Sequence, residues 1–348
     1  MRNRNGVIAF FGLCFVFLLV WSGLALAGVP SPTPFAFTQE VQITNLGDFR
    51  FETGEVVKDF KVSYVTHGKL NEKKDNIILV MDNSWGSTVD FLIGPGKALD
   101  TDKYFIVQTD RLGDPLVRQN ITTGPTNSGL KMEFPRYTIR DSVNAEYKVL
   151  KEHLGFDHIL AAIGGSLGGM AAQVLVRKYP GKVKSLILSH TTTTSPPVDQ
   201  AIALERQKEI ERLQRLLPFL PLWLLRSVSR KRLFRHLSGM EAEDKEFWKA
   251  YLSEMLSFVS KEYVIASNRC QLDFFQSYAF SRDDLVEWPG KVLILESDTD
   301  LHLGPSERTA LRTLYPQAQV HTFHGTGHLT LIINPGGFLS VVRSFLER

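Results

Sequence analysis

Residues 159–170 read ILAAIGGSLGGM, an apolar run followed by a serine with glycines on both sides. From Gly164 to Gly168 the pattern is G-x-S-x-G, which is typical of a sharp turn from a strand to a helix. Such a turn exposes the serine and leaves little room for neighbouring side chains. We predict that Ser166 is a nucleophile and that the backbone N–H of Leu167 faces the developing oxyanion. The alternative is a glycine-rich turn that packs tightly or binds a phosphate.

Apolar runs and helical patterns alternate on both sides of this serine. The apolar runs predict buried strands at residues 77–80, 104–107, 159–163, 183–188, 292–295 and 320–323. The helical patterns cover residues 138–154, 167–179, 306–314 and 338–346. Alternating apolar residues between Val41 and Tyr64 add short antiparallel strands. The fold class that follows is α/β, with a mostly parallel central sheet flanked by helices.

The alternation stops after residue 190 and returns at residues 292–295. Residues 191 to about 265 show helical patterns alone, which predicts a helical cap inserted into the core at residues 191–284. The core is therefore expected in two parts, residues 41–190 and 285–348. Within the cap, the apolar stretch Leu216–Leu225 precedes five basic residues. This stretch is expected to form the cap's own small core, to line an acyl-chain channel, or to make a peripheral membrane contact.

Residues 1–27 have the layout of a secretory signal peptide. Two arginines precede the apolar run Val7–Val20, and the small-residue site Ala25-Leu26-Ala27 follows it. The run is shorter than the ~20 residues of a membrane-spanning helix, which favours cleavage over an uncleaved anchor. Residues 28–40, rich in Pro, Ser and Thr, are expected to be a flexible leader. We therefore expect export, to the periplasm or beyond the cell.

The charge and cysteine content exclude other classes of protein. Lys and Arg number 40 and Asp and Glu 37, a net charge of +3 that is too balanced to indicate nucleic-acid binding. A hydrophobic content of 43% is ordinary for a folded protein and excludes a disordered chain. Removal of the signal peptide leaves Cys270 as the only cysteine, so no intramolecular disulfide is possible.

A serine hydroxyl is a weak nucleophile without a base, and His328 is the candidate base. It lies in a loop just after the predicted strand that ends at Phe323. Asp300 follows the strand at residues 292–295, where an acid would orient the imidazole. Asp298 lies two residues earlier and stays an alternative to Asp300.

Two further elements of the site are less marked in the sequence. The second oxyanion donor should come from the loop after residues 80–81, where the backbone N–H of Ser84 is the candidate and that of Trp85 the alternative. His321, His324 and His328 are unevenly spaced and do not match a zinc site. We therefore predict no metal and no cofactor.

Several segments together resemble the homoserine O-acetyltransferase branch of the α/β-hydrolase superfamily. They are Leu112-Gly113, Thr122–Pro125, Phe134-Pro135, Thr138–Asp141, Gly164–Met170, Asp298–Asp300 and Gly327-His328. The resemblance covers about residues 60–190 and 285–347. It implies the α/β-hydrolase fold, an acyl-enzyme on Ser166, and transfer of an acetyl group to an alcohol or to water.

Three positions differ from the pattern of that family. Leu329 replaces the usual Asp after the base, Asp114-Pro115 stands where a Cys is usual, and Thr191–Thr194 replaces Ala-Arg. With the export signal, these differences favour an ester hydrolase acting on a small-molecule ester or other acyl donor. An O-acyltransferase of the homoserine type is the alternative, and a non-catalytic binding module is the third reading.

Overall fold

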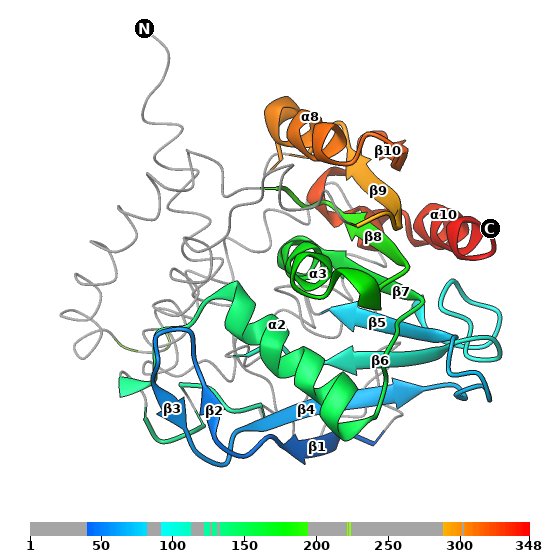
Figure 1. The fold of residues 1–348 in the computed structure, drawn as a ribbon. Helices are drawn as coiled ribbons and strands as arrows, with labels where there is room; N and C mark the ends of the chain where they lie inside the picture. The colour runs from blue at the N-terminus through cyan, green and yellow to red at the C-terminus, as the bar shows by residue number, and fades with distance from the viewer. Residues whose placement is uncertain are drawn as a thin grey trace, which may run out of the picture.

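The computed structural model describes residues 40–81, 92–112, 122–125, 127–130, 133–193, 221, 223, 288–300 and 303–348. Within them the chain forms an eight-stranded sheet in the order β1-β4-β6-β5-β7-β8-β9-β10 (Figure 1). The strands are β1 Gln42–Asn45, β4 Lys61–His67, β5 Ile77–Met81, β6 Phe105–Thr109, β7 Ala161–Gly165, β8 Ser185–Ser189, β9 Lys291–Ser297 and β10 Gln319–Phe323. A separate two-stranded ribbon pairs β2 Phe49–Arg50 with β3 Val56–Val57.

The sheet is mostly parallel, as the sequence predicts. From β6 through β5, β7, β8 and β9 to β10, every neighbouring pair of strands is parallel. Only β1 and β4, at one edge, pair in antiparallel fashion, as expected for residues 41–64. All parallel strands therefore end at one edge of the sheet, where ligands bind in open α/β folds.

Helices cover both faces of the sheet. The helical segments are α2 Ile139–Lys148, the π-helical turn η3 Val149–His153, α3 Leu167–Lys178, η4 Pro180–Lys182, α8 Pro305–Leu314, η6 Gly327–Leu329, α9 Thr330–Ile333 and α10 Pro335–Leu346. One core cluster packs α2, α3 and α8 against Ile77 and Leu79 of β5, and the other packs α10 against Ile78 and Val80. Alternate side chains of β5 thus point to opposite cores, because successive side chains of a strand face opposite ways.

The start of α2 illustrates how local sequence sets an element. The Thr138 side chain accepts hydrogen bonds from the N–H groups of Arg140 and Asp141, and the Asp141 side chain accepts one from the Thr138 N–H. This capping box satisfies N–H groups that have no partner within the helix. Thr138 and Asp141 have the spacing of such a box in the sequence, and the structure forms it.

Two neighbouring strands of the parallel sheet are far apart in the sequence. Strands β8 and β9 pair in register, from Ser185 with Lys291 to Ser189 with Leu295, although about a hundred residues separate them. Most of the predicted cap lies in that interval and outside the described residues. The signal peptide and Ser84, earlier in the chain, also lie outside the described residues. In the described part of the chain, no helix has the length and apolar character needed to cross a membrane.

Candidate active site

Ser166 occupies the tight turn between β7 and α3. Its backbone has φ +50° and ψ −116°, a conformation that residues other than glycine rarely adopt. The turn is held on both sides: the Ser166 N–H donates to the Ser189 carbonyl at 2.8 Å, and the Thr191 hydroxyl donates to the Ser166 carbonyl at 2.7 Å. A strained residue fixed by its surroundings in this way is a mark of a functional site.

Two glycines allow α3 to begin this close to the sheet. A Cβ on Gly164 would lie 2.2 Å from the carbonyl oxygen of Gly168, and one on Gly169 would lie 2.7 Å from the Cβ of Thr191. Gly164 and Gly165 are part of β7, paired with Leu188 and Ser189, so the strand extends beyond the predicted end at Ile163. The apolar pattern stops before Gly164 because a Cβ at that position would overlap the backbone of α3.

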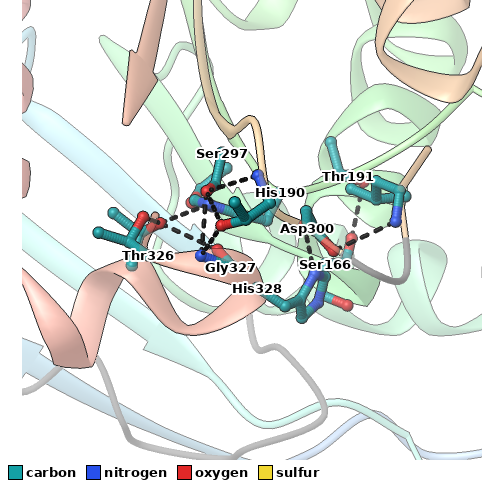
Figure 2. A network of polar contacts seen from close by, with 12 residues as sticks. Ser166, His190, Thr191, Ser297, Asp300, Thr326, Gly327 and His328 are labelled. Carbon is teal, nitrogen blue, oxygen red and sulfur yellow. Dashed lines mark hydrogen bonds and ion pairs between the residues drawn. The ribbon is translucent and has the colours of Figure 1, made fainter. Parts of the chain in front are cut away.

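The structure brings Asp300 and His328 together. The Nδ1 atom of His328 lies 2.8 Å from the Oδ2 atom of Asp300 (Figure 2). The side chain of Asp300 is 1% exposed and that of His328 is 16% exposed. The other carboxylate oxygen of Asp300 accepts a hydrogen bond from the Leu303 N–H at 3.1 Å. A buried carboxylate that is fixed in this way can orient the imidazole ring and set its tautomer.

Asp298, the alternative acid, contacts a different histidine. Its Oδ2 atom lies 2.7 Å from Nδ1 of His324, whose side chain is 83% exposed. Its other oxygen accepts from the Gly325 N–H at 2.9 Å. That N–H and the His324 ring lower the pKa of Asp298. Asp300 is therefore the acid that pairs with His328, whereas Asp298 pairs with a histidine on the surface.

The turn that carries His328 is tied to the neighbouring strand. The N–H of Gly327 lies 3.0 Å from the Ser297 hydroxyl and 3.1 Å from the Thr299 hydroxyl, either of which accepts it. Both hydroxyls belong to the end of β9 and the loop that leads to Asp300. The acid and the turn of the base are thus held by the same short segment.

His190 is a residue of the site that the sequence analysis did not single out. Its Nδ1 atom lies 2.9 Å from the Ser189 hydroxyl, and its ring centroid lies 5.8 Å from that of His328, nearly perpendicular to it. Burial lowers the pKa of His190 to about 3, and repulsion from His328 adds to the effect. The only sequence signal would have been its place, directly after the strand next to β7.

All of these groups follow strands that are neighbours in the sheet. Ser166 comes directly after β7, His190 directly after β8, Asp300 just after β9 and His328 just after β10. Leu167 begins α3, so its N–H has no carbonyl within the helix to donate to and can serve an oxyanion. The second predicted donor, Ser84, lies outside the described residues.

A fold and site of this kind define a class of protein. Residues 99–335 match the family described as the alpha/beta hydrolase fold. Because this match covers more than half of the chain, the chain belongs to the α/β-hydrolase fold family. The fold class expected from the sequence is confirmed.

Within that family, the chain is similar to relatives with curated names. The chain is 38% identical over 166 residues to a homoserine O-acetyltransferase of Deferribacter desulfuricans, an alignment that covers 42% of this chain and 43% of the relative. The chain thus aligns with less than half the length of that relative. The resemblance to the homoserine O-acetyltransferase branch, stated from its motifs, is confirmed over this shared part.

Solved structures of similar fold include both acetyltransferases and ester hydrolases. Homoserine O-acetyltransferase from Bacillus anthracis aligns with a TM-score of 0.70 at 23% identity, over 89% of this chain and 98% of that one. An acetylester hydrolase from Corynebacterium glutamicum aligns with a TM-score of 0.69 at 19% identity, over 89% and 96%. At these identities the structures show the fold alone.

Proposed function

We propose that this chain is an O-acyltransferase that carries the acyl group on Ser166. The observation behind this proposal is the Asp300–His328 pair, at 2.8 Å, on the sheet edge where Ser166 stands in its strained turn. The chain order serine, acid, histidine is that of the α/β-hydrolase triad. The roles expected from the sequence are therefore kept, with Asp300 preferred to Asp298.

The proposed reaction has two half-reactions. Ser166 Oγ attacks the acyl carbonyl while His328 Nε2 takes its proton, and His328 then gives that proton to the leaving group as the bond to it breaks. An acceptor hydroxyl next loses its proton to His328 and attacks the acyl-enzyme. Collapse releases the new ester, and His328 returns the proton to Ser166. Asp300 stabilises the imidazolium in both halves, and the Leu167 N–H stabilises the oxyanion.

The acceptor is inferred from the relatives. Because the curated relatives carry the name homoserine O-acetyltransferase, the proposal is transfer of an acetyl group to a small amino-acid alcohol such as homoserine. This reverses the order of preference reached from the sequence, where hydrolysis came first. The relatives support transfer more than hydrolysis.

Hydrolysis stays a second candidate because of one feature next to the nucleophile. Thr191, Thr192 and Thr193 are all buried, and Thr191 donates to the Ser166 carbonyl. They stand where the resembling family has Ala-Arg, a place near the acceptor and donor pockets of that family. Loss of a cation there weakens recognition of a carboxylate-bearing acceptor and favours water.

The test is an assay of the purified chain with p-nitrophenyl acetate, with and without homoserine. Formation of O-acetylhomoserine supports transfer, whereas acetate release that homoserine does not change supports hydrolysis. Ser166→Ala should abolish activity and covalent labelling by an organophosphonate. Ser306→Ala, an exposed serine at the start of α8, is the matched control and should be labelled like the wild type. Undiminished labelling of Ser166→Ala would refute the nucleophile.

We also propose that residues 1–27 direct export, as their sequence predicts. The physical support is the order of a basic start, an apolar run and a small-residue site. Cell fractionation followed by mass spectrometry tests this. An exported chain that begins at Gly28 is expected, and a cytoplasmic chain that retains residues 1–27 would contradict it.

A further inference from the structure

His190 joins the strand beside the nucleophile to the turn that carries the base. On one side its Nδ1 atom contacts the hydroxyl of Ser189, whose carbonyl accepts the Ser166 N–H. On the other side its Nε2 atom lies 2.7 Å from the hydroxyl of Thr330, 140 positions away in the chain. Thr330 is two residues beyond His328. One buried ring thus spans the two segments whose relative position determines whether Ser166 can reach its base.

The Thr330 hydroxyl stands in a small buried polar cluster. It lies 2.7 Å from Nε2 of His190, 2.6 Å from the Thr326 hydroxyl, and 3.1 Å from the Gly327 carbonyl, to which it can donate. Either neutral tautomer of His190 fits this cluster, because the hydroxyls of Ser189 and Thr330 can each donate or accept. Both ring nitrogens are satisfied in the neutral form, and Thr330 itself is fully buried. A ring with two partners on different elements is held in one orientation.

We propose that His190 is a positioning residue for His328: through Thr330 it fixes the base turn against the end of the strand that anchors Ser166. The inference rests on the proposed function and extends it to a residue for which only the structure gives a role. The 5.8 Å, nearly perpendicular contact between the two rings places His190 directly against the base (Figure 2).

His190 is best neutral because its ring faces the proposed base, His328. Among the described residues, the titratable groups that act on its ring are His328 on η6 and Asp300 after β9. His328 becomes positive when it takes the serine proton. A second positive ring 5.8 Å away would oppose that step, whereas a neutral ring held by two hydroxyls does not.

Four variants separate the two hydrogen bonds of His190. His190→Asn can keep a polar atom near Nδ1 for Ser189 but cannot reach Thr330. His190→Phe keeps the ring and loses both hydrogen bonds. Thr330→Val removes the hydroxyl at nearly unchanged volume, and Thr330→Ser restores it. For each variant, kcat is measured per active site, counted by organophosphonate titration, together with KM and the pH profile of kcat/KM.

A positioning role predicts a loss in kcat with little change in KM. We expect His190→Phe and Thr330→Val to lower kcat per titrated site by roughly tenfold or more, since a misplacement of about 1 Å can cost ~100-fold. We expect the acid limb of the kcat/KM profile to shift, because the environment of His328 changes. Thr330→Ser should recover most of the rate, and the double variant His190→Phe/Thr330→Val should lose little more than either single one.

The results separate failure of this inference from failure of the proposed function. Values of kcat within twofold of wild type and an unmoved acid limb in both His190→Asn and Thr330→Val would overturn the positioning role. Full activity of Ser166→Ala would instead overturn the proposed function. If His190→Phe does not fold, Thr330→Val and its Thr330→Ser rescue decide the matter, because they leave the His190 ring in place.

Discussion

Asp298 and Asp300 differ by two positions in the chain and by their whole environment in the structure. Asp300 is buried against His328, whereas Asp298 pairs with an exposed histidine. Asp300→Asn should therefore lower kcat by about 10⁴-fold, because the amide no longer stabilises the protonated base or fixes its tautomer. The measurement is kcat of the purified variant on p-nitrophenyl acetate.

Asp298→Asn is the matched control for that substitution. It changes the same chemical group two residues away, on a carboxylate that is 43% exposed, and should leave kcat within a few-fold of wild type. If instead Asp298→Asn were the inactive variant and Asp300→Asn the active one, the assignment of the acid would be reversed.

At the scale of elements, the approach of α3 to β7 depends on glycine. A Cβ on Gly164 would meet the backbone of Gly168, which cannot move aside as a side-chain end could. Gly164→Ala should thus destabilise the fold by about 1–3 kcal/mol or more. Gly181→Ala is the control, since a Cβ there meets nothing within 4 Å. Urea unfolding of both variants measures the difference, and equal midpoints would contradict the close approach.

The elements were predictable where a local signal sets them. The apolar runs located the parallel strands, the helical pattern from residue 138 located the start of α2, and G-x-S-x-G located the turn between β7 and α3. His190 had no such signal, because its role depends on Thr330, which only the assembled sheet brings to it. The choice between Asp298 and Asp300 likewise needed burial, which two acids in one turn do not reveal.

At the scale of the whole molecule, a second polar cluster lies in the core outside the site. Glu146 on α2 is buried, and its carboxylate accepts from the Thr109 hydroxyl at 2.7 Å and the Ser142 hydroxyl at 3.1 Å. Thr109 ends β6 and Ser142 accepts the Leu112 N–H, so the cluster ties α2 to the end of β6. Burial raises the pKa of Glu146 to about 7, against an ordinary value of 4.5.

This raised pKa makes a prediction about the stability of the fold. Between about pH 4.5 and pH 7 the folded chain binds a proton at Glu146 that the unfolded chain has lost, so this group lowers stability as the pH rises. Glu146→Gln removes the charge and should stabilise the fold at pH 8, by at most about 3.5 kcal/mol at ~1.4 kcal/mol per pKa unit, while matching wild type near pH 4. Urea unfolding at both pH values measures this difference.

Glu152→Gln, an exposed glutamate one turn beyond α2, is the control and should show no such pH-dependent gain. A difference between Glu146→Gln and wild type that is the same at both pH values would mean that Glu146 is already charged in the folded protein.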